Sequence, residues 1–246
     1  MICVLVDHEK WPDKTFPCVQ VMIGVQLVGE VPPTGLWCPK TYTILAKERT
    51  QAIPLSTFHR QHAREAGKIK RIVEKRAAKA AGNKDQEVQI QAVYDASMAE
   101  IEAGTASGPF TYSHLEKRFG YGKFRPMMRS VIEKNGKYRA VDNGKEMTKT
   151  SIYTQILGRM HPHFPAAVGR LFAEKLADAP FSWKMGGFKD DETAAYKKTA
   201  TITPQFTPAV FADPQTGKAI AIIPHGVNFG HGFAGRGYSR KPCFIN

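Results

Sequence analysis

The chain has 246 residues, and 42% of them are hydrophobic, which is enough to bury a core in one large domain or two small ones. Its formal net charge of +13 favours a polyanionic partner, with nucleic acid ahead of an anionic membrane. The four cysteines form no C-x-x-C pair, which argues against a zinc ribbon. The sequence has no evident signal peptide and no apolar run near the roughly 18 residues that a membrane helix needs. We therefore expect a reduced, soluble, intracellular protein, nuclear or cytoplasmic, without a membrane partner.

The first 104 residues combine a β-like stretch with two helical pieces. Residues 19–31 are rich in β-branched side chains, which predicts a strand or an irregular strand. A helix capped by Thr57 is predicted up to a break at Gly82-Asn83, and residues 85–103 predict a second helix. The first helix has few apolar positions, so it is either a solvated charged helix or one that lies along phosphates. The basic residues assigned to nucleic-acid binding in this region are Arg60, Arg64, Lys68, Arg71 and Lys75.

A predicted linker follows at residues 104–109, whose sequence is GTASGP. We place a domain boundary there, with an N-terminal extension over residues 1–104 and a second domain over residues 105–246. That domain is expected to begin with a short helix at residues 113–119, in which Ser113 and Glu116 form a capping box.

Residues 130–141 predict a β-hairpin that turns at Asn135-Gly136, the strongest short-range signal for such a turn. Lys134, Lys137 and Arg139 lie at or beside its tip. A basic hairpin can grip a triphosphate by charge-assisted hydrogen bonds. The alternative is an ordinary exposed hairpin that carries lysines at its edge.

The segment at residues 187–196 contains adjacent aspartates, Asp190 and Asp191, with Tyr196 five residues after the second. A carboxylate at a strand end can hold a divalent cation, whereas an Asp pair before a helix also serves as a cap or turn. Residues 164–178 predict an amphipathic core helix before this segment, and residues 206–223 predict a second β-hairpin after it. Residues 226–240 are rich in Gly, aromatic residues and Arg, which on its own is typical of an RNA-binding tail.

The order of these pieces resembles the fingers and early palm of retroelement reverse transcriptases, which are RNA-directed DNA polymerases. A basic hairpin is followed by an amphipathic helix, an Asp with Tyr at +5, a β-hairpin and a Phe-Gly segment that ends in aromatic-x-Arg. The resemblance covers roughly residues 110–240, and more loosely residues 29–47. It implies nucleotidyl transfer with Mg²⁺ as cofactor, and an RNA template, a DNA primer and deoxynucleotides as partners.

The resemblance implies roles for the residues of the first two motifs. Residues 137–142, KYRAVD, match the family's fingers strand, so Arg139, with Lys137 or Lys134, is the implied triphosphate clamp. In the first palm motif Asp191 is the implied catalytic residue and Mg²⁺ ligand. Tyr196 is implied to exclude a 2′-hydroxyl and so to favour deoxynucleotides.

The second palm motif matches less closely. Phe229 and Gly230 match its Phe-Gly step, at which the family's backbone approaches the template-primer and the incoming nucleotide. Arg240 matches its final Arg and is assigned to nucleic-acid binding, whereas Asn228 stands where the family has Pro.

Two departures bear on activity. The family has apolar residues beside its first palm Asp, but Asp191 is flanked by Asp190 and Glu192, so Asp190 is the alternative metal ligand. A two-metal site needs several carboxylates, and the family's Y-x-D-D is not found before Asn246. We therefore expect a truncated domain that is inactive as this chain.

These observations predict an α+β fold: a partial right-hand polymerase in which a helical basic N-terminal half leads into a fingers hairpin and an incomplete antiparallel palm sheet with helices on one face. The predicted function is that of a reverse-transcriptase-like fragment. The alternative is a non-catalytic basic protein that binds nucleic acid or belongs to an assembly. A third interpretation, a metal hydrolase, would use four histidines, His161, His163, His225 and His231.

Overall fold

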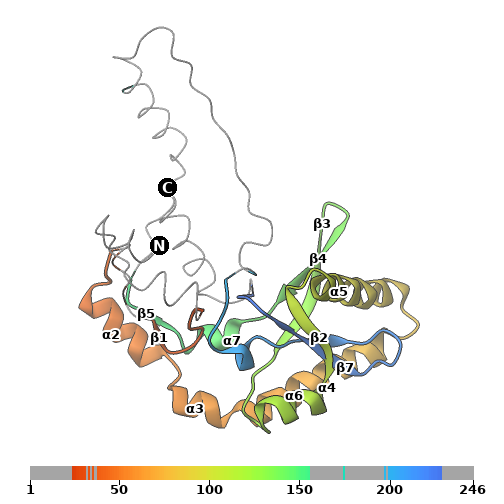
Figure 1. Ribbon diagram of the computed structural model, residues 1–246, viewed down its shortest axis with the longest axis horizontal. Coiled ribbons are helices and arrows are strands. Elements are labelled where there is room, and N and C mark those ends of the chain that lie inside the picture. The colour runs from red at the N-terminus through yellow and green to blue at the C-terminus, as the bar shows by residue number, and fades with distance from the viewer. Residues whose placement is uncertain are drawn as a thin grey trace.

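The computed structural model describes residues 24–155, apart from 32, 34, 36 and 37, together with residues 174, 197 and 199–228. It has a mixed α and β architecture (Figure 1), which confirms the predicted fold class at that level. The elements before the main sheet are β1 (Glu30–Val31), α2 (Tyr42–Gln51), α3 (Leu55–Arg60), α4 (His62–Ala80) and α5 (Lys84–Glu102). The later elements are β2 (Ala106–Thr111), α6 (Tyr112–Phe119), β3 (Met127–Lys134), β4 (Lys137–Asp142), α7 (Lys145–Thr148), β5 (Ile152–Tyr153), η3 (Pro204–Phe206), β6 (Ala209–Ala212) and β7 (Ala219–Pro224).

Five strands form the main sheet in the order β2-β7-β6-β3-β4. Neighbouring strands are antiparallel except β3 and β6, which run parallel, with Met127 opposite Ala209. The prediction of an antiparallel sheet was therefore wrong at this one pairing, which joins two hairpins far apart in the sequence. A separate pair, β1 with β5, is parallel.

Helices cover both faces of this sheet, so the prediction of helices on one face was wrong. Strand β6 shows the arrangement, because all four of its residues are buried. Val210 and Ala212 pack with Val73 of α4, and Ala209 and Phe211 pack with Val93 of α5. Helix α6 lies on the α4 side, where Leu115 joins the same cluster. The sheet is the middle layer of three.

The three predicted helices that fall among the described residues are present, but the first is divided into α3 and α4, and α2 and α7 were not predicted. Their starts also differ from the prediction. Thr57 does not cap a helix; it lies inside α3, which begins after Pro54. Helix α5 is capped by Asn83, whose side chain accepts a hydrogen bond from the amide of Gln86. Helix α6 is capped by Thr111 in place of the predicted Ser113.

The predicted linker at residues 104–109 largely belongs to β2, the edge strand that pairs with β7. Helices before this strand and strands after it share their hydrophobic clusters. Within the described residues, the two predicted regions therefore contribute to one core.

Both predicted hairpins are confirmed. The β3–β4 turn places Asn135 at φ 55° and Gly136 at φ 70°, a conformation that suits these two residue types. In the β6–β7 turn, the Asp213 carboxylate accepts hydrogen bonds from the Gln215 amide and the Thr216 hydroxyl.

Several predicted features lie outside the described residues: the strand residues before Gly24, the helix at 164–178, and the tail beyond Asn228. Among the helices that are described, none is both long enough and apolar enough to cross a membrane.

Candidate functional site

The three predicted triphosphate-binding cations lie together on the β3–β4 hairpin. Lys134 pairs with Lys137, and Ile132 pairs with Arg139. Because side chains alternate along a strand, these four residues share one face of the hairpin, and all four are exposed or half-exposed. The opposite face carries Val131, which packs against α5. The hairpin thus presents its cations on the face turned away from α5.

A buried ion network holds the base of this hairpin. Arg129 on β3 donates to both carboxylate oxygens of Asp142 on β4, at 2.7 and 2.9 Å. It also donates to Glu100 of α5, at 3.1 and 3.3 Å, and to the Ser97 hydroxyl at 3.2 Å. Burial disfavours the charged guanidinium, but the hydrogen bonds and charges of Asp142 and Glu100 raise the pKa of Arg129 above its usual value.

Sequence reasoning missed this network. Asp142 ends the KYRAVD segment on which the resemblance to the fingers strand depends, and here that Asp fixes the hairpin to α5 through Arg129. No sequence signal separates Arg129 from the exposed arginines, because its partners come from elements distant along the chain.

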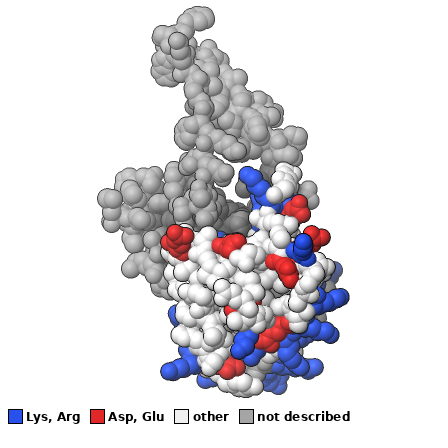
Figure 2. Space-filling model, turned by 90° about the vertical axis from the view of Figure 1, so that its right-hand side faces the viewer, with Lys and Arg blue, Asp and Glu red and all other residues white. Residues whose placement is uncertain are grey.

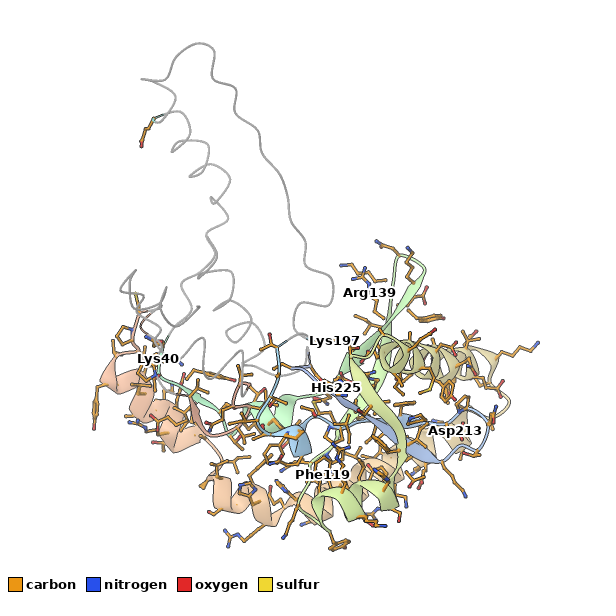
Figure 3. The ribbon with its side chains drawn as sticks, in the orientation of Figure 1. Lys40, Phe119, Arg139, Lys197, Asp213 and His225 are labelled. Atoms are coloured by element: carbon orange, nitrogen blue, oxygen red, sulfur yellow. The ribbon has the colours of Figure 1, made fainter. Side chains whose placement is uncertain are left out.

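Lys197 extends the network to the segment that follows the predicted first palm motif. Its ammonium lies 2.6 Å from the Glu100 carboxylate, which also binds Arg129. A cavity of about 410 Å³ lies beside Lys197, lined by Glu100, Thr105 and Ala140 among others. Figure 3 labels Arg139 on the projecting part of the hairpin and Lys197 lower down, nearer the hairpin's base. Lys197 is the residue directly after Tyr196.

The same segment pairs with the residues that lead into the second palm motif. Ala200 and Gly226 form an antiparallel bridge, and the amide of Val227 donates to the carbonyl of Thr199 at 2.9 Å. Asn228, which stands where the family has Pro, is buried and donates to the carbonyl of Thr207 at 3.4 Å. The residue after Tyr196 and the residue before Phe229 therefore belong to one paired unit.

The remaining predicted site residues lie outside the described residues. They are Asp190, Asp191, Tyr196, Phe229, Gly230 and Arg240. The predicted metal site, which depends on the first two, therefore stays a prediction. No group of three or more His, Cys, Asp or Glu side chains able to hold a metal ion is found among the residues that are described.

Of the four histidines in the hydrolase interpretation, only His225 is described. Its Nδ1 lies 3.0 Å from the carbonyl of Gly104, to which it donates, and its Nε2 lies 2.6 Å from the Ser107 hydroxyl. Both ring nitrogens are thus engaged in joining the end of β7 to the start of β2, a structural role.

The predicted basic helix is confirmed as α4, and its cations form a stripe on the outer surface. The exposed members at helical spacing are Arg64, Lys68, Arg71, Lys75 and Lys79, and Arg60 is exposed at the end of α3. Figure 2 shows Lys and Arg gathered along the lower edge and lower right of the described part, the side on which Figure 1 places α4 and α6. Both acidic residues of α4 are half-buried: Glu65 lies 4.0 Å from Arg125, and Glu74 accepts from the amide of Ala219.

The helix on the other face of the sheet has the opposite charge. Helix α5 contains five acidic residues and one lysine, whereas α4 contains seven Lys or Arg residues and two acidic ones. The three-layer fold thereby separates a basic side from an acidic side.

Comparison of this chain with protein-family models, curated proteins and solved structures gave no match.

Proposed function

We propose that this chain carries the fingers and early palm of a reverse-transcriptase-like nucleotidyltransferase. One observation supports the proposal most. The residue after Tyr196 and the residues before Phe229 belong to one paired unit, and Lys197 of that unit shares Glu100 with the base of the cationic hairpin. The hairpin and the described residues next to the other two motifs thus lie within one connected part of the fold.

In the proposed site each motif has a separate task. Arg139, with Lys137 or Lys134, binds the triphosphate of a deoxynucleotide through charge-assisted hydrogen bonds. Asp191, with Asp190 as the alternative, holds Mg²⁺, which supplies charge stabilisation in phosphoryl transfer when it is bound. The ring of Tyr196 lies under the sugar and excludes a 2′-hydroxyl. The chain's partial right-hand architecture, with the hairpin as fingers and the sheet as part of the palm, belongs to this proposal.

In the ancestral reaction, the 3′-hydroxyl of a primer attacks the α-phosphorus of the nucleotide. A P–O bond to the primer forms, the bond to the β-phosphate breaks, and pyrophosphate leaves. The resemblance covers only the first of the carboxylate motifs that this step needs, so the test measures nucleotide binding and not primer extension.

The experiment is a titration of the full chain with a fluorescent deoxynucleoside triphosphate, with and without Mg²⁺. We expect Mg²⁺-dependent binding that Arg139→Ala weakens by about 10- to 100-fold, the range for losing hydrogen bonds to a charged group. Arg71→Ala, which removes one exposed arginine from α4, is the matched control and should leave this affinity unchanged. Asp191→Ala should abolish the dependence on Mg²⁺.

The second candidate function is nucleic-acid binding without chemistry, which the opposite charges of α4 and α5 favour. It predicts binding that is indifferent to Asp191→Ala. If the wild-type chain binds nucleic acid but no triphosphate at any Mg²⁺ concentration, the polymerase proposal is overturned and this candidate replaces it.

A further inference from the structure

The outer face of α4 is a surface of one charge whose residues the proposed catalytic site does not use. Five exposed cations run along it from Arg64 to Lys79, at steps of three or four residues. With a rise of 1.5 Å per residue, this line is about 22 Å long, or roughly two-thirds of one turn of a nucleic-acid duplex.

The packing of the helix keeps this face free of acidic groups. Glu65 and Glu74 are directed to the flank or the sheet side, toward Arg125 and the amide of Ala219 respectively. Lys70 is also drawn away from the stripe, because its ammonium lies 5.7 Å from the centre of the Tyr112 ring on α6. Of the five stripe cations, Lys68 lies 4.0 Å from Glu65 at the flank of the face, and no ion pair is found for the other four among the described residues. The stripe therefore has the form of a phosphate-binding surface with one charge partly paired within the helix.

Helix α6 widens the surface. It packs beside α4 in the same hydrophobic cluster, and its exposed Lys117 and Arg118 add to the charge. Lys123, in the loop after α6, is exposed as well.

The side chains on the α4 face favour a nucleic-acid duplex over a membrane or a single strand. The apolar side of α4, with Ala66, Val73 and Ala80, is buried against the sheet. None of the described large hydrophobic side chains that are exposed lies on α4. A helix that binds membranes needs an apolar face to insert among lipids, and a surface that binds single strands needs rings for base stacking. Neither is present on the α4 face, and the exposed ring of Tyr121 lies in the loop after α6, at the edge of the surface.

We propose that the α4–α6 face binds the phosphate backbone of a nucleic-acid duplex, without reading its sequence, at a surface separate from the β3–β4 hairpin. Contacts to phosphates fix a duplex in place and carry no base information. This inference deepens the second candidate function by naming its surface and its ligand, and it does not depend on the proposed polymerase function.

The test is fluorescence anisotropy of the full chain with a labelled RNA–DNA hybrid duplex over a series of salt concentrations. The variant Arg71→Gln/Lys75→Gln removes two charges from the centre of the stripe. We expect its affinity to fall about tenfold or more at low salt, and the slope of log K against log salt to decrease by about two, one for each lost phosphate contact. Arg71→Lys/Lys75→Arg, which keeps the charge, should bind like the wild type.

The matched control is Lys47→Gln/Lys145→Gln, which removes two exposed charges from α2 and α7. If both double variants weaken duplex binding equally, only net charge matters and the proposed surface is wrong. Binding to phosphatidylserine vesicles in preference to the duplex would also overturn it. Arg139→Ala should leave duplex binding unchanged while it weakens triphosphate binding, so this proposal and the polymerase proposal can fail separately.

Discussion

Arg129 and Asp142 face each other across the base of the β3–β4 hairpin and are joined by two hydrogen bonds, of 2.7 and 2.9 Å. Both side chains are almost fully buried, with 2% and 7% of their surfaces exposed. Arg129 also binds Glu100, so the hairpin that carries Arg139 is fixed to α5 by charge and not by apolar packing alone.

Arg129→Met should destabilise the fold strongly, because it leaves the buried Asp142 without Arg129, while Glu100 keeps Lys197. Removing one member of a buried ion pair costs about 3–5 kcal/mol. Urea unfolding followed by circular dichroism measures the change. Arg71→Met, on the exposed face of α4, is the control, and its free energy of unfolding should stay within about 0.5 kcal/mol of the wild type. A loss below about 1 kcal/mol for Arg129→Met would contradict the buried network.

His62 should make the stability depend on pH. Burial first, and then the charges of His59 and Arg125, lower the pKa of His62 from 6.5 to about 4. The unfolded chain therefore binds a proton more readily than the folded one between these values. The contribution of neutral His62 to the free energy of unfolding is fully present above pH 6.5. It is lost as the pH falls toward 4, by up to about 3 kcal/mol.

The measurement for His62 is the difference in free energy of unfolding between the wild type and His62→Leu across pH 4 to 7. Carboxylates titrate in both proteins, so the difference isolates the histidine. We expect the variant to show a flatter profile between pH 4.5 and 6.5, in the range bounded by the two pKa values. Parallel profiles would mean that the ring is not held neutral by burial.

Tyr112→Phe should stabilise the protein. The ring is buried in the cluster between α4, α6 and the sheet, and its hydroxyl has no hydrogen-bond partner among the described residues. An unsatisfied buried polar group costs about 1–3 kcal/mol, so removal of the hydroxyl should recover about 1 kcal/mol. Thermal unfolding compares this variant with Tyr138→Phe, whose hydroxyl is on an exposed side chain and should be neutral. A lower melting temperature for Tyr112→Phe would show that the hydroxyl has a partner.

Local signals predicted the local elements of this fold. The Asn135-Gly136 step located the first hairpin, and β-rich runs around Asp213 located the second, because turn chemistry is a property of a few neighbouring residues. Local signals do not decide the cap of α6, because Thr111 and Ser113 are both good caps two residues apart and only packing selects Thr111.

Features made by distant segments could not be predicted in the same way. The parallel pairing of Met127 with Ala209 joins two hairpins that each look complete in the sequence. The burial of Arg129 depends on Glu100 and Asp142, which no spacing rule connects. One signal for helices on both faces was present: β6 reads Ala-Val-Phe-Ala without a polar residue, a pattern typical of a strand covered on both sides.

Gly226→Ala should disrupt the unit that joins the segments beside the two predicted palm motifs. A Cβ atom at this position would lie 2.0 Å from the carbonyl oxygen of Lys197, and a backbone atom cannot move aside as a side chain can. We expect a loss of about 1–3 kcal/mol in the free energy of unfolding, the usual cost of overpacking, together with weaker Mg²⁺-dependent triphosphate binding. The control is Gly67→Ala on α4, where nothing lies within 4 Å of the added carbon. That change should stabilise the helix by about 0.5–1 kcal/mol. If Gly226→Ala is as harmless as Gly67→Ala, Lys197 and Gly226 are not neighbours, and the proposed contact between the segments beside the two predicted palm motifs is lost.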